Sequence, residues 1–145
     1  MKLYHYTTWR GEQINRDRVI LCSLRYAQWT GETLLDDWPR LTFLTSNPSW
    51  EPSVQAITDS MRWEKCGSHP ETYDALGIPC WRFEINPNGI VMGYPMDFTG
   101  DDRWLAMLDD AVKMGSHLED WRVVCQDVMV VKSWKWEDDE WNLKD

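Results

Sequence analysis

Short runs of aromatic and β-branched residues, bounded by turn-forming residues, recur along the chain and limit what it can fold into. Residues 2–8 form the first run, and residues 40–46 form another that stops at Asn47-Pro48. Residues 80–85 alternate apolar and polar side chains, which is typical of a half-buried strand. We predict further strands over residues 19–22, 90–92 and 121–125, and a strand pair or one bent strand over residues 128–136.

Helical patterns lie between these runs. Residues 101–114 carry apolar side chains at helical spacing and end at Gly115, which predicts a helix. Ser49 is suited to cap a second helix from about Trp50, whereas residues 11–15 suit a short helix or a turn. Residues 64–79 contain several glycines and prolines and are expected to be irregular. The chain is therefore predicted to be one α+β domain over residues 1–145, with a mainly antiparallel sheet.

Composition and charge restrict the function classes. No apolar run approaches the ~20 residues of a membrane span, and no charged start leads into an apolar signal segment, so we expect a cytoplasmic protein. The net charge is −9, with an acidic run at residues 137–140, which disfavours electrostatic binding of nucleic acid. Solubility alone explains this charge, although it also suits a nucleic-acid mimic or a protein that docks on a basic partner. A local basic groove stays open, because four arginines lie early in the chain: Arg10, Arg16, Arg18 and Arg25.

The cysteines and tryptophans give weaker indications. Cys22, Cys66, Cys80 and Cys125 are widely separated, so we expect reduced thiols, and the segment from Cys66 to His69 lacks the paired spacing of a zinc site. Most of the 11 tryptophans are expected to pack in or near the core, and one or two of them to line a pocket for a planar ligand. No metal site is predicted.

Three segments, taken in order, resemble the ADP-ribosyltransferase fold. They are the strand "LYHYT" with His5 at its centre, the strand "LTFLTSNPSW", and "HLEDWRVVCQDVMVV", in which an acidic pair precedes a strand. The resemblance is to the histidine-bearing branch, which includes the diphtheria-toxin-like and poly-ADP-ribose polymerase enzymes, and to small phage and bacterial proteins. It implies a split antiparallel sheet that binds NAD in a cleft.

The resemblance also implies roles for individual residues. His5 would bond a ribose, with Tyr6 and Thr7 beside it on the strand, while a late acid would stabilise the positive charge on the nicotinamide ribose. Glu119 or Asp120 takes the acidic position, and strict register selects Asp120, an aspartate where the family has glutamate. Gln126 is a third candidate if the strand is shifted. The remaining candidates would contact the nicotinamide or the pyrophosphate: Phe43, Thr45, Ser46, Trp50 and, among the early arginines, Arg18.

These residue types suit the chemistry. Cleavage of the nicotinamide–ribose bond passes through an oxocarbenium-like state that a fixed carboxylate stabilises. One bound dinucleotide can touch His5 and the acid only if they lie within roughly 15 Å of each other. The same residues also suit ordinary positions: a half-buried strand histidine, a helix cap and a solvated loop.

The expected function is an NAD-dependent ADP-ribosyltransferase acting on a macromolecular target, either a protein or a nucleic-acid base. In that case the chain would be a toxin or an effector of phage–host conflict, with an antitoxin or host factor as partner. The alternatives are a non-catalytic acidic interaction or inhibitor protein, such as an inactive transferase fold, and a hydrolase that destroys NAD.

Overall fold

The fold is described from a computed structural model that covers residues 1–8, 10–22, 42–57, 63–65, 69–98 and 102–144. Its strands are β1 (Tyr4–Thr7), β2 (Val19–Ile20), β3 (Thr42–Thr45), β4 (Gln55–Ile57), β5 (Trp63–Lys65), β6 (Trp81–Ile85), β7 (Trp121–Val124), β8 (Val128–Glu137) and β9 (Glu140–Leu143). The helices are α1 (Gly11–Asp17), α3 (Pro70–Ala75) and α4 (Asp102–Lys113), with 3-10 turns at Pro95–Phe98 and Leu118–Asp120. Among the described residues, no helix has both the length and the apolar character to cross a membrane.

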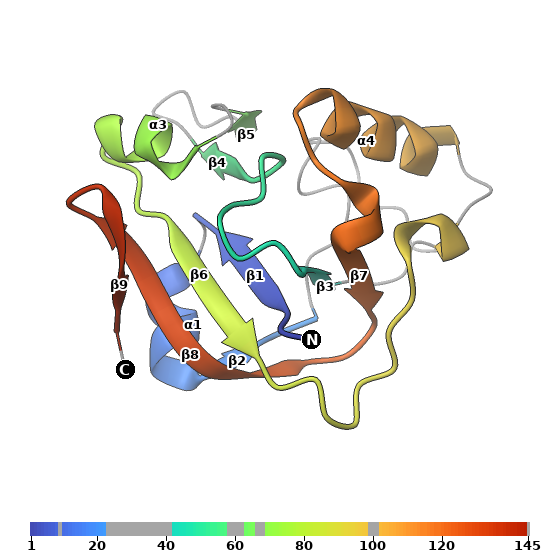
Figure 1. Cartoon of the computed structure of the whole chain (residues 1–145), viewed down its shortest axis with the longest axis horizontal. Coiled ribbons are helices and arrows are strands. Elements are labelled where there is room, and N and C mark those ends of the chain that lie inside the picture. The colour runs from blue at the N-terminus through green and yellow to red at the C-terminus, as the bar shows by residue number, and fades with distance from the viewer. Residues whose placement is uncertain (9, 23–41, 58–62, 66–68, 99–101, 145) are drawn as a thin grey trace.

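A seven-stranded sheet organises the fold (Figure 1). Its order is β2-β8-β6-β1-β3-β7, with β9 added to β8, and β4 and β5 form a separate ribbon. Every strand pair is antiparallel. The predicted α+β class with a mainly antiparallel sheet is therefore confirmed. Between β1 and β3 the register contains only Tyr4 opposite Thr45, so these two central strands are joined at a single position.

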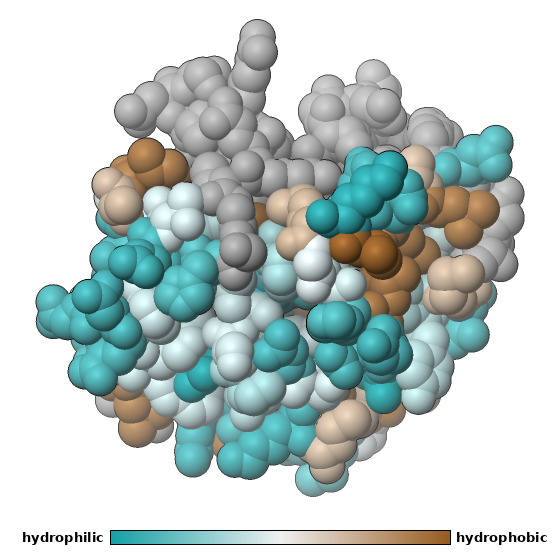
Figure 2. Space-filling model, turned by 45° about the horizontal axis from the view of Figure 1, so that its top comes forward, coloured by the Kyte–Doolittle hydropathy of each residue, from teal (hydrophilic) through white to brown (hydrophobic). Residues whose placement is uncertain are grey.

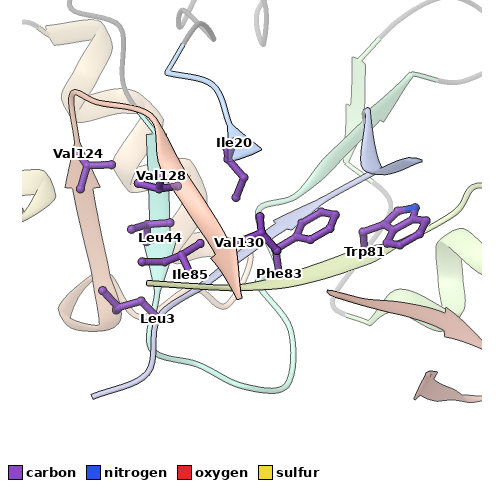
Figure 3. Packing of buried hydrophobic residues seen from close by; sticks show 9 residues of the cluster. All are labelled: Leu3, Ile20, Leu44, Trp81, Phe83, Ile85, Val124, Val128 and Val130. Carbon is purple, nitrogen blue, oxygen red and sulfur yellow. The ribbon is translucent and has the colours of Figure 1, made fainter. Parts of the chain in front are cut away.

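Strand alternation gives the sheet two differently covered faces. The face that packs against α1, here called the α1 face, buries a cluster labelled in Figure 3: Leu3, Ile20, Leu44, Trp81, Phe83, Ile85, Val124, Val128 and Val130. The opposite face, here called the α4 face, carries Tyr4 and Tyr6 packed against Tyr73 of α3, and Trp121 and Val123 packed against Trp104 of α4.

Gly11 is required where α1 begins. A Cβ atom at this position would lie 2.0 Å from the Trp81 indole ring, so α1 approaches the α1 face only because residue 11 has no side chain. Ile14 then packs on the same cluster. This contact explains why residues 11–15, predicted as a short helix or a turn, are helical.

Three local predictions are wrong. The helix expected from Trp50 is absent, because the Asn47 side chain accepts from Ser49 N and donates to the Trp50 carbonyl, and these bonds close a turn instead. Residues 64–79, expected to be irregular, include α3, whose first turn is capped by His69. Residues 90–92 are not a strand; the segment meets the sheet only through a bridge between Gly93 and Val123.

Other predictions are confirmed. The helix over residues 101–114 is α4, and residues 128–136 form one long strand, β8, that bends at a register shift opposite Glu84 and Ile85. The hairpin that adds β9 was not predicted, since its acidic residues do not resemble a strand. Arg25 lies outside the described residues.

Candidate functional site

His5 lies where the central strands of the sheet separate. It pairs with Phe83 on β6, so its side chain belongs to the α1 face, and its imidazole Nδ1 lies 2.9 Å from the carbonyl oxygen of Phe43 on β3. A carbonyl only accepts, so Nδ1 carries the proton and Nε2 keeps its lone pair in the neutral ring. Burial lowers the pKa of His5 below 6.5, so the ring is neutral at pH 7.

Nε2, the second ring nitrogen of His5, is the one available to a ligand. Within the described part of the chain, no group hydrogen-bonds Nε2. The backbone bond at Nδ1 fixes both the tautomer and the orientation of the ring. His5 therefore presents a hydrogen-bond acceptor of defined direction, suited to a ligand hydroxyl.

The register of three strands places the backbone of Asp120 relative to that of His5. Tyr4, Thr45 and Trp121 form one row across β1, β3 and β7; His5 follows this row and Asp120 precedes it. Two strand spacings of about 4.8 Å and two residues of about 3.3 Å put their Cα atoms roughly 12 Å apart. Asp120 is the last residue of the 3-10 turn Leu118–Asp120, so it lies directly before the first residue of β7 that pairs with β3.

The other two candidates for this position, Glu119 and Gln126, differ from Asp120 in exposure and place. Glu119 is exposed, and its carboxylate lies 3.7 Å from Nδ1 of the exposed His117. Asp120 is half-buried, and its backbone oxygen accepts from Ser46 N at 2.9 Å. Gln126 lies beyond the other end of β7, where its side chain accepts from Val91 N at 3.4 Å. Asp120 is thus the acid best placed to share a ligand with His5.

Several other candidates lie on the opposite face from His5. The Tyr6 hydroxyl donates to the Asn47 carbonyl at 2.6 Å, and burial strongly raises the pKa of this phenol. The Phe43 ring stacks on Trp104 at 5.9 Å, and the Thr45 hydroxyl accepts from Asn47 N at 3.1 Å. Trp50 is buried among aromatic rings on the same α4 face. These side chains stabilise the fold and do not line one site with His5.

Thr7 and Arg18 lie on the α1 face. Thr7 is buried in β1 opposite Trp81. Arg18 donates to Ser133 Oγ at 2.8 Å and to the Val131 carbonyl at 2.9 Å. Ser133 pairs with Phe83, which pairs with His5, so this guanidinium lies in the same row of the sheet, two strands away from His5.

Two other early arginines, Arg10 and Arg16, and the described residues of the segment first considered as a metal site do not join this group. Arg10 is exposed, and Arg16 pairs with its neighbour Asp17 at 3.1 Å. His69 uses Nδ1 to accept from Glu71 N at the start of α3, and Cys80 is buried beneath that helix. Cys66 lies outside the described residues.

Glu51 was missed by the sequence analysis. Its carboxylate accepts from Trp121 Nε1 at 3.0 Å, from Ser116 Oγ at 2.8 Å, and from both the backbone and the hydroxyl of Ser53. The only sequence signal is its position between Trp50 and Pro52, which was interpreted as the start of a helix.

Comparisons of the chain with protein-family models, with curated proteins and with solved structures found no match. Any function must therefore be argued from the side chains described above.

Proposed function

We propose that the chain binds NAD on the α1 face of its sheet and transfers the ADP-ribose to a macromolecular acceptor. The observation that carries this proposal is the relation between His5 and Asp120. His5 is a neutral imidazole held in one orientation with an acceptor nitrogen, Asp120 is half-buried, and the strand register puts the Cα atoms of these two residues roughly 12 Å apart. The three segments that resemble the ADP-ribosyltransferase fold, and the antiparallel sheet joined at one central position, support the same assignment.

In this proposal His5 and Arg18 bind the nucleotide. Nε2 of His5 accepts from a ribose hydroxyl, while its Nδ1 stays bonded to Phe43. Arg18 supplies positive charge on the same face for the pyrophosphate, although its guanidinium also bonds Ser133 and Val131. The residues present therefore fit an anionic dinucleotide.

Asp120 supplies the negative charge that the reaction needs. As the bond between C1′ and the nicotinamide nitrogen breaks, nicotinamide leaves with the bonding electrons, and the ribose becomes positively charged. The carboxylate stabilises this charge, a nucleophile of the acceptor bonds to C1′, and the proton of that nucleophile passes to a base or to solvent. Aspartate is one methylene shorter than the family's glutamate, so the ribose must lie closer to β7.

The acceptor is proposed from charge alone. A net charge of −9 disfavours contact with a phosphate backbone and favours a protein, or a single base presented without much backbone. A toxin or host-conflict role, with an antitoxin or host protein as partner, belongs to the same proposal.

Release of nicotinamide from NAD tests the proposal. Asp120→Asn should lower the rate by about 10²- to 10³-fold, the effect expected when one charge-stabilising group is lost. Glu119→Gln separates the two neighbouring carboxylates and should change the rate less than about twofold, because its side chain is exposed. The proposal fails if the wild-type protein releases no nicotinamide, or if both variants lose activity equally.

A second function is favoured by one observation. The β8–β9 hairpin exposes Asp138, Asp139 and Glu140 at its tip, as an acidic protein that occupies a basic surface would. If NAD neither binds nor turns over, this non-catalytic interaction role becomes the better account of the chain.

A further inference from the structure

The Glu51 carboxylate is a junction between two segments that are far apart in the sequence. One oxygen accepts from the Trp121 indole N–H, and the other accepts from Ser116 Oγ and from Ser53. Ser116 follows the C-terminal end of α4 at Lys113 after two intervening residues, and Trp121 is the first residue of β7. Glu51 therefore bonds residues on both sides of the turn that contains Asp120.

Other contacts attach the same two segments. Ser46 N donates to the Asp120 carbonyl at 2.9 Å. Residues 46–53 therefore bond the turn at three places: Ser116, Asp120 and Trp121. Gly115 has a φ of +106°, and a Cβ atom there would contact the Pro52 ring at 3.7 Å. Residues 117–120 are thus held from one side by the segment that follows β3.

Burial makes these hydrogen bonds difficult to replace with bonds to water. Trp121 is 3% exposed and Ser116 is 5% exposed, so water cannot easily replace the carboxylate. Hydrogen bonds to a charged group are stronger than neutral ones, and a buried donor that loses its acceptor carries the full desolvation penalty. Removing the carboxylate should therefore let the turn move.

We propose that Glu51 is a positioning residue, which fixes the turn 116–121 and so sets the place of the Asp120 carboxylate. The role in catalysis rests on the function proposed above. Glu51 itself does not face His5, because its partner Trp121 lies on the α4 face. It acts on the reaction only through the turn.

The test combines hydrogen exchange with kinetics in four proteins. These are the wild type, Glu51→Ala, Glu51→Gln and the control Glu84→Gln, which changes a half-buried glutamate of β6 that pairs with Lys2. NMR measures exchange at the Ser46 amide and at the Trp121 indole N–H, with the Phe83 amide as core reference. Nicotinamide release gives kcat, and calorimetry gives the Kd for NAD.

For Glu51→Ala we expect about tenfold or faster exchange at Ser46 and Trp121 relative to Phe83, and a fall in kcat of about 10- to 100-fold. The Kd for NAD should stay within about twofold, since His5 is untouched. Glu51→Gln keeps one acceptor oxygen and should restore part of both effects, and Glu84→Gln should match the wild type. If Glu51→Ala does not fold, Ser116→Ala removes a single bond and should shift the same readouts by a smaller factor.

Two results would overturn the inference. Unchanged exchange at Ser46 and Trp121 in Glu51→Ala would show that the carboxylate does not hold the turn. Equally accelerated exchange at Phe83 would show that Glu51 stabilises the whole fold without a particular effect on the turn. If instead the wild type lacks turnover, the proposed function fails, whereas the exchange data still decide whether Glu51 fixes the turn.

Discussion

His5 combines two properties that are rarely found together in an ordinary core residue. Its Nδ1 is bonded to the Phe43 carbonyl, whereas no described group bonds its Nε2. His5 is half-buried, and its Nε2 is not among the fully buried side-chain atoms of the described residues that lack a hydrogen-bond partner. The available acceptor nitrogen, Nε2, is the reason for proposing that a ligand binds on the α1 face.

The lowered pKa of His5 predicts how stability depends on pH. In the unfolded chain this imidazole titrates near 6.5, so between that pH and the lower folded pKa only the unfolded chain takes up the proton. The free energy of unfolding should fall as the pH drops below 6.5, by up to about 1.4 kcal/mol per pH unit, and this contribution should be flat above 6.5.

Urea unfolding of the wild type and of His5→Phe from pH 5 to pH 8 measures this effect. Both proteins share the exposed His69 and His117, so the difference between their curves isolates position 5. Parallel curves across the whole range would contradict a buried, neutral His5.

The structural place of a single residue could be predicted from the sequence only where it belongs to a recognisable pattern. His5 stands in a run of strand-forming residues, which predicts its strand. Glu51 has no such pattern, since its four donors come from residues 53, 116 and 121 and depend on tertiary packing. Phe43 was a candidate because it lies in the second segment of the resemblance and has an aromatic ring, but the alternation of β3 turns this ring to the other face.

At the scale of elements, the β8–β9 hairpin closes through a strained turn. Glu137 pairs with Glu140, so Asp138 and Asp139 form the two-residue loop, and both have positive φ values of 54° and 61°. A turn of this kind prefers Asn-Gly, and other residues with positive φ are disfavoured.

The double substitution Asp138→Asn with Asp139→Gly should therefore stabilise the protein, by about 0.5–1 kcal/mol in urea unfolding. Asp139→Ala serves as the opposite control, because alanine lacks the polar side chain that tolerates this conformation, and it should destabilise. If both variants shift stability in the same direction, removal of negative charge explains the result better than the turn.

The two faces of the sheet predict different effects for two site candidates. Tyr6→Phe removes the donor to the Asn47 carbonyl on the α4 face and should cost about 1–2 kcal/mol of stability with NAD affinity unchanged. Arg18→Lys, on the α1 face, loses the guanidinium fork and should weaken NAD binding about tenfold. Calorimetric titration of both variants checks this, and the reverse ranking would place the ligand on the α4 face.

Element types were predictable where periodicity was strong, as in α4 and β6. The predicted helix from Trp50 failed because side-chain bonds from Asn47 and Glu51 satisfy the backbone locally, which a propensity argument cannot foresee. The strand β9 was missed because its pairing with β8 outweighs its acidic composition.

In the whole molecule, the segment that follows β2 lies against the end of β7, although β2 and β7 stand at opposite ends of the strand order. Cys22, just after β2, donates its N–H to the Asp127 carboxylate at 2.8 Å and brings its sulfur within 3.7 Å of the Val124 carbonyl on β7. Ile20 and Val124 therefore share one cluster (Figure 3). The face of the molecule seen in Figure 2 is mostly polar, and several of its hydrophobic groups gather at the upper right of the view. No sequence pattern predicts this contact, because it joins residues that are 102 positions apart in the chain.

Calorimetric titration of the purified protein with NAD, at pH 7.5 and fixed ionic strength, tests the central claim most directly. His5→Phe is the matched variant, because it keeps an aromatic ring in the strand and removes both ring nitrogens. The account predicts that the wild type binds NAD and that His5→Phe binds at least about tenfold more weakly while remaining folded. Absence of binding by the wild type at millimolar NAD, or equal binding by both proteins, would contradict it.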